Sequence, residues 1–177
     1  DYGMTITLTA VFIGQLFLAG LPMMLVIGAG VTGVAGMVLA YFTVPHVAKR
    51  INIYLDPSSG DSYQIQKSLE AFNSGGLFGR GPGEGIVKTS LPDSHTDFIF
   101  AVAGEELGLF ACLALVALFG FFVLRTIWQL QKQENRFVLI AGAGLLMFFG
   151  LQAVINMGVA LHLLPTKGMT LPLVSYG

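Results

Sequence analysis

The feature that constrains this chain most is a long stretch without charge. No Asp, Glu, Lys or Arg occurs between Asp1 and Lys49, a run of 47 residues, and none occurs in the 30 residues between Arg136 and Lys167. A soluble domain carries roughly a quarter charged residues, whereas 11% of this chain is charged and 54% is hydrophobic. We therefore expect it to fold in lipid, because so few charges cannot solvate a globular surface.

The composition excludes several classes of protein. Nine basic and ten acidic residues leave a net charge of −1, which gives no reason to expect a nucleic-acid partner. Disorder, a collagenous repeat and a disulfide scaffold are excluded, and the single Cys112 lies in an apolar run. No basic segment followed by a small-residue cleavage site opens the chain, so no signal peptide is expected.

Four apolar stretches are candidates for helices that cross a bilayer. A spanning helix needs about 20 apolar residues, because backbone groups find no water in the hydrocarbon core. The predicted spans cover residues 5–19, 23–44, 98–124 and 137–161. Between the first two stand Gly20, Leu21 and Pro22, where we expect a tight turn. The sequence thus predicts an all-α integral membrane protein, a polytopic helical bundle.

The basic residues predict the orientation of this bundle. The short turn at 125–136 carries Arg125, Lys132 and Arg136, and such a density of positive charge is typical of the cytoplasmic side. The predicted organisation is a two-helix hairpin (1–44), a large extracytoplasmic loop (45–97), two further spans (98–161) and an extracytoplasmic segment (162–177).

The large loop holds eleven of the 19 charges, and loops of this length are usually functional or disordered. Residues 64–72 can form a short amphipathic helix with three apolar side chains on one face, Ile65, Leu69 and Phe72. Six of the eleven residues at 75–85 are Gly, with Arg80 in the middle. Such a turn can aim backbone N–H groups at a phosphate. A tight structural turn is the alternative, since no Lys-Ser/Thr follows to complete a P-loop.

The sequence LPDSHTD at 91–97 runs directly into the third predicted span. Asp97 therefore lies at the mouth of a helix, partly out of water, where a carboxylate can act as a general base. The alternative is that Thr96 or Asp97 caps the helix by accepting hydrogen bonds from its free N–H groups. His95 could assist Asp97 or bind a metal, or it is simply solvated.

Glu105 and Glu106 lie two turns further along the same predicted span. Ionised carboxylates at membrane depth are costly and indicate function, and neighbours on a helix lie about 100° apart, so the two cannot easily face one partner. The alternative is a buried hydrogen bond or ion pair that holds helices together. Gln152, Asn156 and His162 are candidate partners, or they are simply interhelical hydrogen bonders.

Three motifs resemble those of a known family: Asp1-Tyr2-Gly3, LPDSHTDFIFAVAGEELG at 91–108 and LPTKGMTLPLVSYG at 164–177. On these motifs the chain resembles the SEDS family (shape, elongation, division and sporulation) of membrane glycosyltransferases. Pro165-Thr166-Lys167-Gly168 is most similar to the division and sporulation branch. The resemblance covers nearly the whole chain. Since the family has about ten membrane helices, these four look like the sixth to ninth.

The resemblance implies a peptidoglycan glycosyltransferase that polymerises lipid II at the outer face of the bacterial cytoplasmic (inner) membrane, at the division septum. The family's essential aspartate falls on Asp97, which would take the proton from the attacking acceptor hydroxyl. Basic side chains would bind the undecaprenyl pyrophosphate leaving group; the candidates are Lys49, Arg50, Arg80, Lys88, His95 and Lys167. A divalent cation (Mg²⁺ or Mn²⁺) could be held partly by the pyrophosphate, but no ligand cluster requires a metal. The implied partners are lipid II, a class B penicillin-binding protein that acts as transpeptidase, and other membrane proteins of the division machinery.

Two other functions stay open. Lipid II flipping has also been proposed for this family, and Glu105 and Glu106 would suit the polar path of a transporter. The other function is that of a scaffold whose outer loop only recruits and activates partners.

Overall fold

The computed structural model describes residues 2–55, 63–91, 94–164 and 168–176, and every regular element in these ranges is helical. The elements in chain order are α1 (Tyr2–Leu18), α2 (Met23–Thr43), α3 (Pro45–Leu55), α4 (Tyr63–Gly75), the 3-10 helix η1 (Val87–Ser90), α5 (Ile99–Leu130) and α6 (Arg136–Ala160). The prediction of an all-α bundle is confirmed. The starts and ends of α1, α2 and α6 fall within three residues of the predicted spans.

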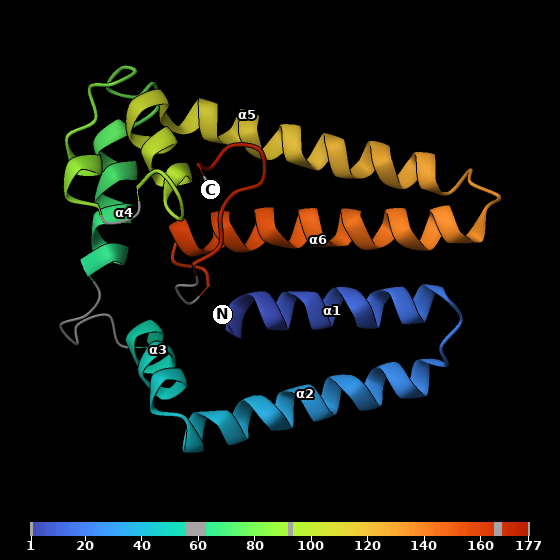
Figure 1. Cartoon of the computed structure of the whole chain (residues 1–177). Coiled ribbons are helices and arrows are strands. Elements are labelled where there is room, and N and C mark those ends of the chain that lie inside the picture. The colour runs from blue at the N-terminus through green and yellow to red at the C-terminus, as the bar shows by residue number, and fades with distance from the viewer. Residues whose placement is uncertain (1, 56–62, 92–93, 165–167, 177) are drawn as a thin grey trace.

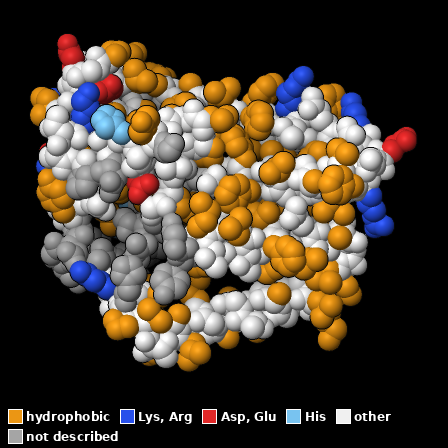
Figure 2. Space-filling model, in the orientation of Figure 1, with side chains coloured by type: hydrophobic (Ala, Val, Ile, Leu, Met, Phe, Trp, Pro, Cys, Tyr) orange, Lys and Arg blue, Asp and Glu red, His pale blue; other side chains and the backbone are white. Residues whose placement is uncertain are grey.

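In the part of the chain that the structure describes, three helices, α2, α5 and α6, are long and apolar enough to cross a membrane. The apolar helix α1 is shorter, at 17 residues, and it lies alongside α6, which packs in turn on α5 (Figure 1). In Figure 2 the charged side chains lie toward the two ends of the molecule, and hydrophobic side chains cover much of the surface between them. This distribution suits helices whose middles contact lipid.

The connections divide the bundle into two ends. The α1–α2 and α5–α6 turns lie together at one end, which we call the turn end (Figure 1). The helices α3 and α4 and the beginning of α5 lie at the other, which we call the loop end. The tight turn predicted between the first two helices is present, with Gly20 at a φ of 107° that favours glycine.

The turn predicted at 125–136 is shorter than expected. The helix α5 continues to Leu130 and α6 begins at Arg136, because the apolar pattern extends past Arg125 to Ile127 and Trp128. The Lys132 ammonium lies 3.9 Å from the Trp128 ring centroid, and the side chain of Asn135 caps α6. The charge of Arg125 does not end α5, because the residues that follow it in the sequence are still mostly apolar.

The large loop contains more helix than the sequence predicted. The helix α3 was not predicted, whereas the predicted helix at 64–72 is confirmed as α4. Its buried face differs from the expected one: Ile65, Ser68 and Ala71 are buried and Leu69 is exposed. The reason is the close approach of α4 to α5 and α6, where Ser68 Oγ donates a hydrogen bond to the Ala160 carbonyl at 2.7 Å.

The helix α5 is broken at Gly108, whose φ of 81° and ψ of −178° are not helical. Residues 75–81 of the Gly-rich loop pack into the break, and their backbone replaces the missing helical hydrogen bonds. The N–H groups of Arg80 and Gly81 donate to the carbonyls of Glu105 and Glu106, both at 3.0 Å, and the N–H groups of Leu109 and Phe110 donate to the carbonyls of Gly76 and Leu77, at 3.0 and 3.4 Å. The first two turns of α5 are thereby fixed to the loop.

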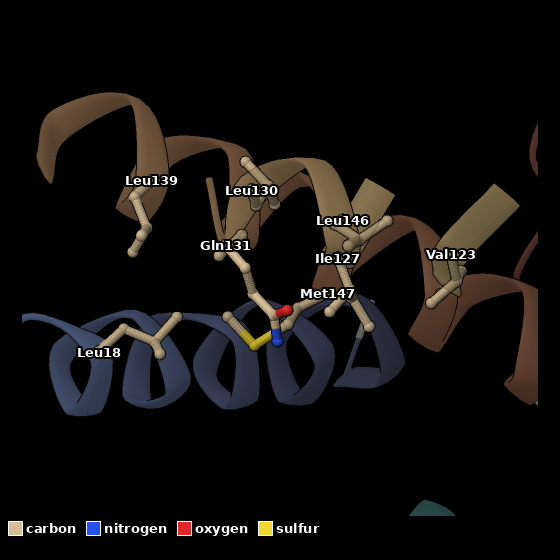
Figure 3. Close-up of a pocket in the computed structure, with 10 residues that line it drawn as sticks. Leu18, Val123, Ile127, Leu130, Gln131, Leu139, Leu146 and Met147 are labelled. Carbon is tan, nitrogen blue, oxygen red and sulfur yellow. The ribbon is translucent and has the colours of Figure 1, made fainter. Parts of the chain in front are cut away.

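A cavity of about 410 Å³ lies between α1, α5 and α6 near the turn end (Figure 3). Its lining is apolar apart from Gln131, and includes Leu18, Ile127 and Met147. It contains none of the polar residues that the sequence analysis selected.

Candidate functional site

Asp97 lies in a series of turns that leads into α5 at the loop end. The N-cap position of α5 is Phe98, which makes no side-chain cap hydrogen bond. The Asp97 carboxylate lies against Gly168, because a Cβ on this glycine would be 3.2 Å from Asp97 Oδ2. The side chain is partly buried.

Asn156 joins the segment of Asp97 to the C-terminal segment 168–176. Its side chain comes from α6, is 1% exposed, and donates through Nδ2 to the carbonyl of Asp97 at 2.8 Å and to that of Met169 at 2.6 Å. Two carbonyl acceptors require the NH₂ side of the amide to face them. The Oδ1 atom is buried and has no hydrogen-bond partner among the described residues.

Ser175 makes a second connection between these segments. Its Oγ donates to the Thr96 carbonyl at 2.6 Å and accepts from the Leu171 N–H at 2.7 Å. The Tyr176 N–H donates to the His95 carbonyl at 3.1 Å. The two long sequence motifs therefore form one site, with α6 as its support.

A cavity of about 410 Å³ opens beside this site. His95, Ile99, Val174 and Tyr176 line it, and the His95 side chain is exposed. The cavity lies next to the motif that contains Asp97.

Glu105 is fully buried and binds backbone rather than another side chain. Its Oε1 accepts from the N–H groups of Ile86 and Val87 at 2.7 and 2.8 Å, and its Oε2 accepts from that of Lys88 at 2.9 Å. The carboxylate thus satisfies three donors at the start of η1, where an anion is favoured. Asn156, one of the candidate partners on α6, bonds to the carbonyls of Asp97 and Met169 instead.

Glu106 forms an ion pair with Lys88, and both side chains are mostly buried. The Lys88 ammonium also donates to the Gly83 carbonyl at 3.1 Å. The charge of Lys88 is therefore compensated within the chain. Both acids precede the break at Gly108 and contact the loop, so they do not lie in an uninterrupted span as expected.

The remaining basic candidates lie on separate elements. Lys49 is exposed on α3, and exposed Arg80 donates through Nε to the Ser74 carbonyl at 3.3 Å. Arg50 belongs to α3, but its side chain lies outside the described part, as does Lys167 altogether. The backbone N–H groups of Arg80 and Gly81 are bonded to α5, which supports the structural alternative for the Gly-rich loop over a phosphate cradle.

Gly168 and Ser175 lie within the motif at 164–177, but neither was predicted as a site residue. The available signal was the small size of both residues within that motif. Among the described residues, no group of three or more His, Cys, Asp or Glu side chains comes together. This part of the chain therefore offers no cation site built from protein ligands alone.

The chain matches the model of the cell cycle protein family of FtsW, RodA and SpoVE over residues 1–177. It belongs to this family. Two of its curated relatives in the family are called probable peptidoglycan glycosyltransferase FtsW: one from Caulobacter vibrioides, 45% identical over 177 residues, and one from Legionella pneumophila, 41% identical over 184 residues. Each alignment covers 100% of this chain, but 45% and 47% of the relative. The chain thus spans about half the length of these curated relatives.

A solved structure supports the family's fold for this chain. The match has a TM-score of 0.69 and 28% sequence identity, and covers 92% of this chain and 46% of that one. That structure is described as "Structural coordination of polymerization and crosslinking by a peptidoglycan synthase complex". With its apolar helices and this family membership, the chain is part of a multi-pass membrane protein.

Proposed function

We propose that this chain carries the catalytic region of a peptidoglycan glycosyltransferase, which polymerises lipid II into glycan strands during cell division. One observation carries the proposal: the Asp97 turn and the C-terminal motif form a single site, held by Asn156 and Ser175. The names of the curated relatives point to the same activity. The proposal concerns the whole protein, of which the chain provides about half by the length of these relatives.

In the proposed reaction, the acceptor sugar's 4-hydroxyl attacks the anomeric carbon of the donor. The new C–O bond forms as the bond to the undecaprenyl pyrophosphate oxygen breaks, with inversion to a β-1,4 linkage. The hydroxyl proton passes to the Asp97 carboxylate, which acts as the general base. Base assistance of this kind contributes about 10² to 10⁴ in rate. The carboxylate lies beside Gly168, where any side chain would contact it.

The leaving pyrophosphate needs positive charge to stabilise it. We favour Lys167, because it precedes Gly168 in the sequence and Gly168 contacts the Asp97 carboxylate. His95 at the neighbouring cavity is the second candidate. Lys49, Arg50 and Arg80 remain candidates, whereas Lys88 is the weakest, since Glu106 already neutralises it.

The same proposal gives the orientation of the chain in the membrane and its partners. We place the loop end on the extracytoplasmic side of the inner membrane, at the division septum, and the turn end with Arg125, Lys132 and Arg136 in the cytoplasm. The similar solved structure is a peptidoglycan synthase complex, which supports a class B penicillin-binding protein as partner. Other membrane proteins of the division machinery complete the proposed assembly.

The transporter alternative depended on Glu105 and Glu106 as a polar path. Both carboxylates have partners in η1 and the Gly-rich loop, so they give that alternative little support. We therefore keep glycan polymerisation as the single proposed function.

The test measures glycan-strand synthesis from lipid II by the full-length protein with its transpeptidase partner in detergent, where no flipping is needed. We expect Asp97→Asn to lower the rate by about 10² or more, while Glu84→Gln, an exposed carboxylate in the same loop, keeps the wild-type rate. Wild-type synthesis by Asp97→Asn would reject the catalytic role. No synthesis by the wild-type complex would reject the proposed function.

A further inference from the structure

The tip of the Gly-rich loop carries large apolar side chains on the outside of the molecule. Leu77 is 54% exposed and Phe78 is 81% exposed, and the ring centroid of Phe78 lies 5.4 Å from that of Phe110, which is itself 56% exposed. Exposed apolar patches of this kind mark contacts with a protein or a membrane. We call Leu77, Phe78 and Phe110 the apolar tip.

The break in α5 fixes the depth of the apolar tip. After Gly108, residues 109–130 form an uninterrupted helix of 22 residues, which rises about 33 Å. The hydrocarbon core of a bilayer is about 30 Å thick, so this part of α5 matches it. Trp128, with Lys132 over its ring, marks one boundary, and Phe110 lies at the other.

We propose that the apolar tip is a membrane anchor, which inserts into the interfacial layer of phospholipids at the loop end. Aromatic rings are enriched at this depth at both boundaries of a bilayer. The tip needs no further ordering to insert, because Gly76 and Leu77 accept hydrogen bonds from the N–H groups of Leu109 and Phe110.

The positive charge of Arg80 near the apolar tip also favours contact with phospholipids. Arg80 follows Phe78 by two residues and is exposed, and a guanidinium binds phosphate oxygens well. An aromatic ring with an arginine beside it matches the boundary between acyl chains and phosphate groups. The anchor would hold the Gly-rich loop, and with it η1, at a constant height above the lipid.

The experiment places an environment-sensitive fluorescent amino acid at position 78 of the full-length protein in phospholipid nanodiscs. Phospholipids with a nitroxide near the headgroup or deep in the acyl chain serve as quenchers. We expect headgroup-level quenching at position 78 to exceed that at Glu84 by about threefold or more, and to exceed deep quenching. Glu84 is the matched control, because it is exposed in the same loop.

Equal quenching at positions 78 and 84 would overturn the anchor. So would protection of position 78 from both quenchers, which would show that protein covers it. The same label at Leu77 provides a second reporter if position 78 does not tolerate it. Neither readout depends on enzymatic activity, so the result is independent of the proposed function.

Discussion

The side-chain amide of Asn156 on α6 donates a hydrogen bond to the backbone carbonyl of Asp97 at 2.8 Å. The same nitrogen donates to the Met169 carbonyl at 2.6 Å. One buried polar group therefore sets the distance between the segment with the proposed base and the C-terminal segment 168–176. Changing such a contact is expected to move the residue whose position it fixes.

Asn156→Leu removes both donors while keeping the number and branching of the side-chain heavy atoms. Two buried carbonyls lose their partner, at a cost of about 1–3 kcal/mol each in the free energy of unfolding. We expect glycan synthesis to fall at least tenfold, roughly, as the two segments separate. Thermal unfolding and single-turnover synthesis measure the two effects. The control is Asn73→Leu on the exposed face of α4, and equal effects of both variants would contradict the prediction.

Gly168→Ala tests the space beside Asp97. The new methyl group would lie 3.2 Å from Asp97 Oδ2, so the carboxylate must shift by a few tenths of an ångström. We expect kcat to fall roughly tenfold with little change in unfolding temperature, because geometry at the reacting group affects rate strongly. Gly28→Ala is the control, since nothing lies within 4 Å of its Cβ position. A wild-type kcat for Gly168→Ala would show that this contact does not matter.

Gly108→Ala tests the break in α5. Its positive φ disfavours any side chain, and the Cβ would lie 2.3 Å from the backbone nitrogen of Gly79. We expect a loss of at least about 2 kcal/mol in the free energy of unfolding, measured by denaturant titration in detergent. Gly120→Ala, in the same helix with open space around it, should instead be neutral or stabilise by up to about 1 kcal/mol. Similar values for both variants would argue against a required break.

Lys88→Met and Glu106→Gln test whether Lys88 has a structural role or binds the phosphate of the substrate. Each single variant leaves a mostly buried partner without its opposite charge, so each should destabilise the protein. The double variant should lose less than the sum, with a coupling of about 0.5–3 kcal/mol in a double-mutant cycle. If the ion pair is structural, the double variant also recovers glycan synthesis. An inactive but stable double variant would instead assign Lys88 to the substrate.

The membrane helices could be predicted because apolar runs and charge placement depend on local sequence. Asp97 could be selected for the same reason, since a carboxylate before an apolar run is visible in the chain itself. The break at Gly108 could not be predicted, because one glycine among apolar residues is compatible with a regular helix. Only the approach of residues 75–81 shows why this position must be glycine.

The hydrogen-bond partners of the acidic residues could not be predicted from the local sequence. Glu105 was expected to meet side chains on α6, but it binds three backbone N–H groups of the segment 86–88. Backbone donors are present at every residue and leave no mark in the sequence. The same holds for the carbonyls of Asp97 and Met169 that Asn156 binds.

The exchange of backbone hydrogen bonds at the α5 break has a mechanical consequence. The Gly-rich loop cannot move away from α5 without breaking four backbone hydrogen bonds, and each group left buried and unbonded costs about 1–3 kcal/mol. Loop and helix therefore move as one rigid body. A protein that binds the loop from outside would displace a membrane helix, and the turn end would receive that displacement through the length of α5.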